Sequence, residues 1–318
     1  MHAVNRMRST RVIGTITNRN LVTGLAALIA VVLWASAFAG IRASLADYGP
    51  YHLALFRWLA SSVIFLLLAI IKPLRMPSRE HIPLIVLTGL LGIVGYSVLL
   101  NLGELTVTAG AASFIVNTVP IQTAILSAFL LSEKITRPLL VSMLTGLLGV
   151  GLIAFGEKSS VNLFNTGALL ILLAALSQAI YFISQKKLLK HYTPLEVVSY
   201  TSLSGTAILF VFVPGLAHTI ISASSSATIS VLYIGVFPGA IGYLIWTFVL
   251  SRMPAAKATQ FLYLVPFVAM IISYFWLFEI PSLKSLGGGI IVLLGLVYLL
   301  SGQRSAGQNQ NRARGASI

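Results

Sequence analysis

The sequence predicts an all-α membrane protein with ten transmembrane helices, arranged as two inverted five-helix repeats with both termini in the cytoplasm. Of its 318 residues, 57% are hydrophobic and 9% are charged, and the mean hydropathy is +0.94, far outside the range of soluble domains. Apolar runs of about twenty residues recur from Leu21 to Leu300, each long enough to cross roughly 30 Å of hydrocarbon as a helix. A proline and a glutamate recur at a constant offset in two of these runs.

Each expected span is an apolar run between charged residues or proline and glycine breaks. The runs must be helices, because lipid cannot hydrogen-bond open backbone groups and the runs are too long and continuous for barrel strands. The first run is too long for a signal peptide and lacks a convincing cleavage site, so we expect it to remain as a span. The expected spans are residues 21–44, 52–71, 82–103, 108–131, 138–155, 165–185, 195–216, 228–250, 256–278 and 283–301.

The basic residues sort by side of the membrane. Only Lys158 and Lys284 fall in the loops of one side, and Arg42 and Arg57 lie within the ends of the first two spans. The other seventeen of the 21 fall on the opposite side: Arg6, Arg8, Arg11, Arg19, Lys72, Arg75, Arg79, Lys134, Arg137, Lys186, Lys187, Lys190, Arg252, Lys257, Arg304, Arg312 and Arg314. Because positive loops stay inside, both termini are predicted to be cytoplasmic. The net charge of +14 therefore reflects topology, and we expect no nucleic-acid partner.

The two ends of the chain differ from the spans. Residues 1–20 and 302–318 are basic, polar and short of apolar residues, so we expect two cytoplasmic tails without regular structure. Between them the sequence predicts a first repeat over residues 21–155 and a second over residues 156–301.

The repeat is visible as matched residues. Pro120 precedes Glu133 by thirteen residues, and Pro266 precedes Glu279 by the same distance. Further matched pairs are Gly149 and Gly295, Tyr48 and Tyr192, Pro50 and Pro194, Phe38 and Phe182, and Arg42 and Lys186. Five spans are an odd number, so the second half must enter the membrane from the opposite side.

The matched prolines and glutamates suggest moving parts. A single proline in a membrane helix is often a tolerated kink, but interrupted helices at corresponding positions of inverted repeats point to a binding site near the midplane. We predict that Pro120 and Pro266 act as hinges and that Glu133 and Glu279 act as gate residues. The alternative for the glutamates is a surface ion pair with a neighbouring lysine.

Arg42 and Arg57 approach the outer face of the membrane in the predicted topology. Their long side chains either snorkel to the interface or line an outer vestibule, where they would join the gate residues.

The chain resembles the drug/metabolite transporter superfamily, in particular its bacterial ten-span branch with two EamA domains. Trp34, Phe38, Arg42, Pro50 and Arg57 form the pattern W-x3-F-x3-R-x7-P-x6-R, and the two P-x12-E pairs follow. The resemblance covers about residues 25–301. It implies an exporter or exchanger of amino acids or other small metabolites, including the aromatic amino acid exporter type. The second half departs from the pattern, with Gln178 at the position of Trp34 and no arginine that matches Arg57.

Polar and aromatic side chains well inside the spans are the candidates for substrate binding. They are Trp34, Phe38, Tyr96, Asn117, Gln178, Tyr181, Tyr243, Trp246, Gln260 and Tyr263. Together they would form a mostly apolar cavity with amide and phenol groups, which suits an amphipathic, aromatic or zwitterionic solute. The alternatives are packing or interfacial positions for the aromatic residues and interhelical hydrogen bonds for the amides.

No charged residue or histidine lies near the centre of any expected span. A site for phosphorylated sugars would need central cations, so neutral or zwitterionic solutes are favoured. A midplane carboxylate for a driving proton or sodium ion is missing as well, which favours facilitated export or exchange. There are no cysteines, and the five histidines are scattered, so we expect no metal site and no cofactor.

The sequence therefore predicts a secondary transporter of a small amphipathic metabolite in the inner membrane, in contact with lipid, that works by alternating access. An uptake permease or a drug or cation efflux protein of the same fold stays open, as do a channel and an integral-membrane enzyme from other classes. An enzyme would need clustered catalytic side chains that the sequence does not contain. The sequence leaves the oligomeric state open and is compatible with a monomer.

Overall fold

The computed structural model describes residues 2–107, 109–156, 166–277 and 282–315, all of it helix or loop and without a strand. In chain order the elements are α1 (His2–Ile71), η1 (Arg79–His81), α2 (Ile82–Gly89), η2 (Leu90–Gly95), α3 (Tyr96–Gly103), α4 (Ala109–Val116), α5 (Val119–Leu130), α6 (Arg137–Gly156), α7 (Thr166–Leu188), α8 (Pro194–Leu209), η3 (Phe210–Phe212), α9 (Leu216–Ser222), α10 (Ser225–Ile234), η4 (Gly235–Gly242), α11 (Tyr243–Arg252), α12 (Ala255–Ala258), η5 (Thr259–Tyr263), α13 (Leu264–Leu277) and α14 (Leu283–Gly315).

Eight helical segments of the described chain are long and apolar enough to cross a membrane. They coincide with the first four expected spans and with the sixth to the ninth. The expected fifth and tenth spans are apolar helices of shorter length, Arg137–Ile153 and Leu286–Ser301. The all-helical membrane fold is thus confirmed, and the count of ten spans stays a prediction.

The first two expected spans form one continuous element, α1. Gly49 breaks its helical geometry with a φ of 64° and a ψ of 171°, and Pro50 follows directly. A positive φ is readily adopted only by glycine, so the chain can change direction here without a loop. One candidate span, residues 20–38, precedes this break, and a second, residues 43–71, contains it near its start.

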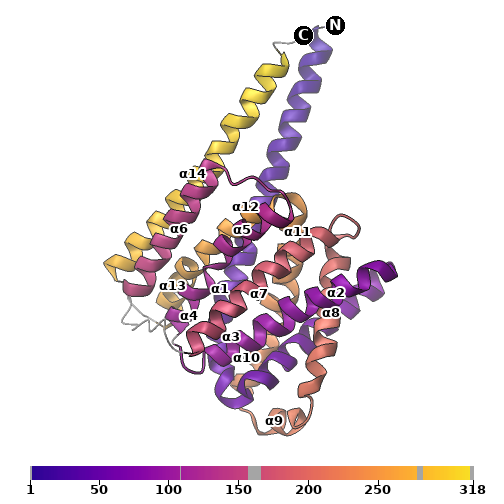
Figure 1. The fold of residues 1–318 in the computed structure, drawn as a ribbon, viewed down its shortest axis with the longest axis vertical. Helices are drawn as coiled ribbons and strands as arrows, with labels where there is room; N and C mark the ends of the chain where they lie inside the picture. The colour runs from indigo at the N-terminus through magenta and orange to yellow at the C-terminus, as the bar shows by residue number, and fades with distance from the viewer. Residues whose placement is uncertain (1, 108, 157–165, 278–281, 316–318) are drawn as a thin grey trace.

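The expectation that the two tails lack regular structure was wrong. α1 begins at His2 and α14 ends at Gly315, so both basic tails continue the adjacent helices, since a formed helix propagates at little cost per added residue. The segment between the seventh and eighth expected spans contains the short helix α9. Figure 1 shows α9 at the end of the molecule opposite both termini.

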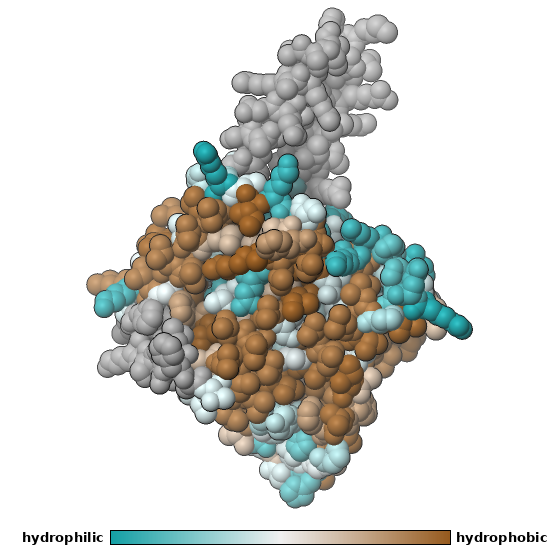
Figure 2. Space-filling view, in the orientation of Figure 1, coloured by the Kyte–Doolittle hydropathy of each residue, from teal (hydrophilic) through white to brown (hydrophobic). Residues whose placement is uncertain are grey.

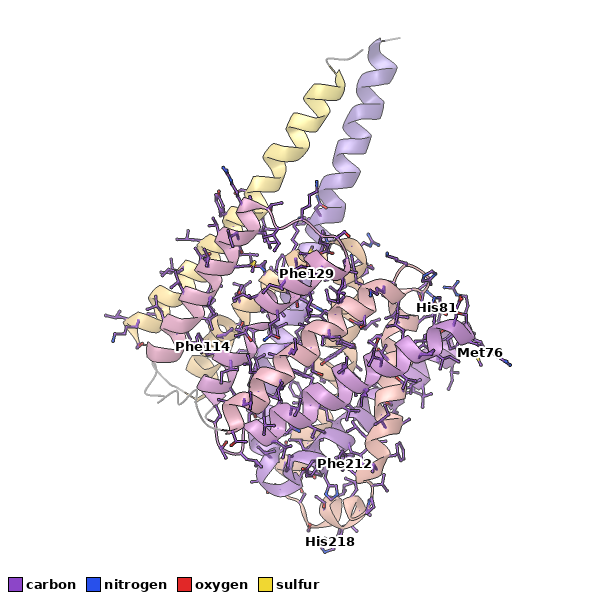
Figure 3. All side chains as sticks on the ribbon, in the orientation of Figure 1. Met76, His81, Phe114, Phe129, Phe212 and His218 are labelled. Atoms are coloured by element: carbon purple, nitrogen blue, oxygen red, sulfur yellow. The ribbon has the colours of Figure 1, made fainter. Side chains whose placement is uncertain are left out.

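Apolar side chains cover the middle of the surface. Leu148, Leu294 and Val297 are 65%, 64% and 60% exposed, and Figure 2 shows hydrophobic residues across the centre of the visible face with hydrophilic residues gathered toward its margins. Figure 3 places His218 of α9 at one such margin and His81 at another. A surface of this kind is stable when lipid covers it.

Several helices are interrupted where the two halves meet. Residues 117 and 118 separate α4 from α5, and the tighter 3-10 turn η5 precedes α13 at the matching place. Wide π-helical turns occur in η2 and η4, which follow α2 and α10. Such irregular turns often occur at functional sites and free backbone groups inside the bundle.

Close backbone contact joins α6 to α14, which run side by side in Figure 1. A Cβ atom at Gly288 would lie 2.4 Å from the carbonyl oxygen of Gly149, and one at Gly149 would lie 2.5 Å from the carbonyl oxygen of Gly288. Only glycine permits this approach, which joins the fifth and tenth expected spans.

Candidate functional site

A cavity of about 660 Å³, counted to its opening, lies among helices of both halves. Its lining is mostly apolar, as in most small-molecule sites. The lining residues are Trp34, Ala37, Phe38, Ile41, Arg57, Tyr96, Leu100, Val116, Asn117, Val119, Gln178, Phe182, Tyr243, Leu262 and Val265. Six of them belong to the ten predicted substrate-binding residues, and Arg57 belongs to the predicted gate residues. The structure brings these seven together from α1, α3, the break after α4, α7 and α11.

Trp34 forms part of the aromatic wall of this cavity. Its indole Nε1 donates a hydrogen bond of 3.2 Å to the carbonyl oxygen of Pro238 in the wide turn η4. Its ring lies 5.3 Å from the Tyr243 ring in an edge-on arrangement and is stacked 6.3 Å from Phe182. The wall therefore joins the first span to two spans of the second half.

Two amide side chains present unpaired acceptors at the cavity. Asn117 lies in the break between α4 and α5, and its Nδ2 donates to the carbonyl oxygen of Ser113 at 2.8 Å. Its Oδ1 and the Oε1 of Gln178 are buried without a hydrogen-bond partner. A buried acceptor without a partner is destabilising unless a ligand or water satisfies it.

Arg57 differs most from its expected position. The sequence placed it toward the outer face, whereas the structure buries it at 5% exposure on the cavity wall. The reason is its rotation on α1: Ala54, Trp58 and Ser61 are also buried, and these spacings of three and four residues define one helix face. The sequence LALFRWLASS over residues 53–62 has apolar residues on every side of a helix, so it does not by itself show this face.

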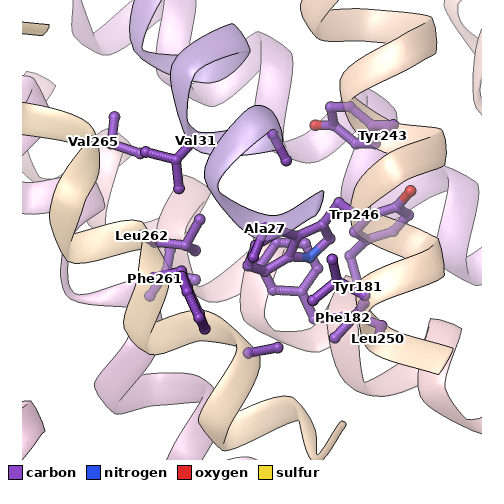
Figure 4. Packing of buried hydrophobic residues seen from close by; sticks show 14 of the residues in the cluster. Ala27, Val31, Tyr181, Phe182, Tyr243, Trp246, Leu250, Phe261, Leu262 and Val265 are labelled. Carbon is purple, nitrogen blue, oxygen red and sulfur yellow. The ribbon is translucent and has the colours of Figure 1, made fainter. Parts of the chain in front are cut away.

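Four predicted site residues do not line the cavity. Tyr181, Trp246 and Tyr263 are at most 1% exposed and belong to the hydrophobic core, and Gln260 donates to the carbonyl oxygen of Ala256. Figure 4 shows Tyr181 and Trp246 packed in this core. The Trp246 ring lies 5.0 Å from that of Trp34, so it supports the cavity wall from behind.

Glu133 contacts the second half of the chain. Its carboxylate oxygens accept hydrogen bonds from the backbone N–H groups of Ala255 and Ala256, at 2.9 and 3.1 Å. The described residues show no ion pair between Glu133 and the neighbouring Lys134. Close by, Lys186 donates to the carbonyl oxygens of Leu250 and Met253 at the end of α11. A carboxylate is favourable at a helix start and a cation at a helix end.

The structure describes only some of the remaining hinge and gate candidates. Pro120 is the second residue of α5 and Pro266 the third of α13, so each follows an interruption of its span. The side chain of Arg42 and the whole of Glu279 lie outside the described residues.

The other lining residues were missed. Most are aliphatic, such as Ile41, Val116 and Leu262, and the sequence does not distinguish an aliphatic side chain at a cavity from one at lipid. Phe182 was recognised only as the repeat partner of Phe38. Within the described residues no three histidine, aspartate or glutamate side chains come together as a metal site.

The model of the EamA-like transporter family matches the chain twice, over residues 22–155 and 165–301. The chain belongs to the EamA-like transporter family. It is 44% identical to "Uncharacterized transporter YdfC" of Bacillus subtilis over 266 residues, which cover 84% of this chain and 87% of that protein. It is 35% identical to "Probable terminal-alkyne amino-acid exporter" of Streptantibioticus cattleyicolor over 285 residues, or 90% and 95% of the two chains.

A solved crystal structure shares the fold of this EamA-type chain. The TM-score is 0.71 at 18% sequence identity, with 89% of this chain and 98% of the other covered. The family, the apolar helices and these relatives together make the protein a multi-pass membrane transporter of the drug/metabolite type. A transporter of this kind binds a small-molecule substrate and is surrounded by lipid.

Proposed function

We propose that the protein is a secondary transporter that exports a small amphipathic metabolite, an amino acid or a related compound, across the inner membrane by alternating access. The observation that carries this proposal is the composition of the cavity, which both halves line. Three pairs of lining residues occupy matching positions of the two halves: Trp34 and Gln178, Phe38 and Phe182, and Val119 and Val265. In an inverted-repeat transporter, the substrate site lies between the repeats in this way.

The chemistry of the cavity supports an amphipathic solute. Aromatic and aliphatic side chains provide an apolar surface, and the free acceptors of Asn117 and Gln178 provide polar contacts. The relative in Streptantibioticus cattleyicolor bears a name that specifies amino-acid export. Export of an amino acid or a related metabolite is compatible with both observations.

Alternating access requires a part that bends and a part that closes. The proposed architecture has two inverted repeats over residues 21–155 and 156–301, with both termini in the cytoplasm. Pro120 and Pro266 follow the interruptions of corresponding spans and are proposed as hinges. Glu133, which binds the start of α12, is proposed as a gate residue on the cytoplasmic side.

The test is flux of radiolabelled solutes in proteoliposomes. The panel includes phenylalanine, tryptophan, threonine and methionine, each with and without an imposed pH gradient. We expect uptake into preloaded vesicles for at least one aromatic member without a gradient. Absence of flux for the whole panel contradicts amino acid transport, and strict dependence on the gradient contradicts uncoupled exchange.

A further inference from the structure

The Arg57 guanidinium makes no ion pair with the described part of the chain. It is 95% buried, its Nε makes no hydrogen bond, and no carboxylate of the described residues lies within ion-pair distance of it. Its guanidinium carbon lies 5.4 Å from the centroid of the adjacent Trp58 ring, and its charge also acts on the phenol groups of Tyr96 and Tyr243, which line the same cavity. Arg57 is therefore a desolvated cation on the wall of the cavity.

A buried charge without a counter-ion is strongly unfavourable. Charged side chains inside membrane bundles accordingly pair with one another or face a cavity that holds an ion or a substrate. Arg57 lines the cavity. A negatively charged solute in the cavity can therefore compensate this charge.

We propose that Arg57 binds the carboxylate of the transported solute, so that the transporter selects monocarboxylates over their amides and over amines without a carboxylate. This inference rests on the proposed function and names its substrate class. One guanidinium balances one negative charge and can bind a carboxylate through two parallel hydrogen bonds. A phosphate ester, with nearly two negative charges, would keep excess charge in a mostly apolar site.

The rest of the cavity complements the other parts of such a solute. The free acceptors Asn117 Oδ1 and Gln178 Oε1 can accept hydrogen bonds from an ammonium group. Phe38 and Phe182 offer an apolar surface for the side chain. These contacts add to the ionic contact with Arg57 and are not required for it, so a carboxylate without an ammonium group should still bind.

The experiment measures binding of four solutes with the same phenyl ring: phenylalanine, 3-phenylpropionate, phenylalaninamide and phenethylamine. Quenching of tryptophan fluorescence reports occupancy, because Trp34 lines the cavity. Because charge-assisted hydrogen bonds are strong, the two carboxylates should bind the wild-type protein at least about tenfold more tightly than phenylalaninamide and phenethylamine.

Arg57→Gln should remove this carboxylate preference and leave phenylalaninamide binding unchanged, whereas Arg57→Lys should keep part of the preference. Arg79→Gln, which removes the same charge from an exposed position, is the matched control.

The outcomes separate the two proposals. Equal binding of phenylalanine and phenylalaninamide to the wild-type protein overturns the role of Arg57 even if Arg57→Gln fails to fold, and flux of amino acids would leave the transport proposal standing. Carboxylate preference that is lost in Arg57→Gln supports the role even if no panel member is transported. Three further outcomes also overturn the role of Arg57. They are an unchanged carboxylate preference in a folded Arg57→Gln protein, the absence of binding for every solute, and tighter binding of inorganic phosphate than of the carboxylates.

Discussion

The carboxylate of Glu133 accepts a hydrogen bond of 2.9 Å from the backbone N–H of Ala255, 122 residues later in the chain. The contact joins the end of α5 in the first half to the start of α12 in the second. It satisfies a backbone donor that a helix start would otherwise leave open. A change in this contact would therefore alter how the two halves meet.

Glu133→Ala should loosen the contact between the halves. Loss of a helix cap costs about 0.5–2 kcal/mol, so side chains buried near this contact should become accessible more often. The measurement is labelling of a cysteine introduced at Thr259, which is fully buried, in a chain that contains no other cysteine. Faster labelling than in an otherwise identical Glu80→Ala control is expected, and equal rates would refute the gate.

Gly288→Ala should destabilise the pair α6 and α14. The added Cβ would lie 2.4 Å from a backbone oxygen, and overpacking of this kind costs about 1–3 kcal/mol. Gly287→Ala is the control, because a Cβ there meets nothing within 4 Å. Thermal unfolding in detergent should show a lower midpoint for Gly288→Ala alone. Identical midpoints would mean that the close approach contributes nothing.

Trp246→Ala and Asn117→Ala should have different consequences. Trp246 is fully buried behind the cavity wall, so its truncation should cost about 3–5 kcal/mol of stability. Asn117 lines the cavity, and its truncation should weaken solute binding with little change in stability. Unfolding midpoints and binding isotherms of both variants check this. A binding defect in Trp246→Ala at normal stability would instead make that side chain a direct contact.

Pro120→Ala and Pro266→Ala should slow transport several-fold without weakening solute binding. Each substitution restores a backbone donor near an interrupted turn and makes bending there less favourable. Initial rates of counterflow in proteoliposomes are the measurement, and the loop variant Pro77→Ala is the control. Normal rates in correctly inserted proteins would exclude a hinge role.

The matched Pro120 and Pro266 predicted where spans would be interrupted, because a proline leaves a carbonyl without its helical partner wherever it occurs. The helical tails and the continuous α1 were not predicted. Composition alone does not reveal that a helix extends into a basic segment or that Gly49 replaces a loop. For the site, Trp34, Asn117 and Gln178 were recognised as polar or aromatic groups inside apolar runs, whereas aliphatic lining residues carry no such signal.

The sequence by itself determined the helical membrane fold and the approximate position of each span, since lipid forces every long apolar run to satisfy its own backbone. Only the tertiary structure decided which side of each helix faces the cavity. That rotation depends on contacts between distant segments, such as the bond from Trp34 to Pro238, 204 residues apart. It turned Arg57 from an expected position near the outer face to the cavity wall, and it placed Trp246 behind that wall instead of on it.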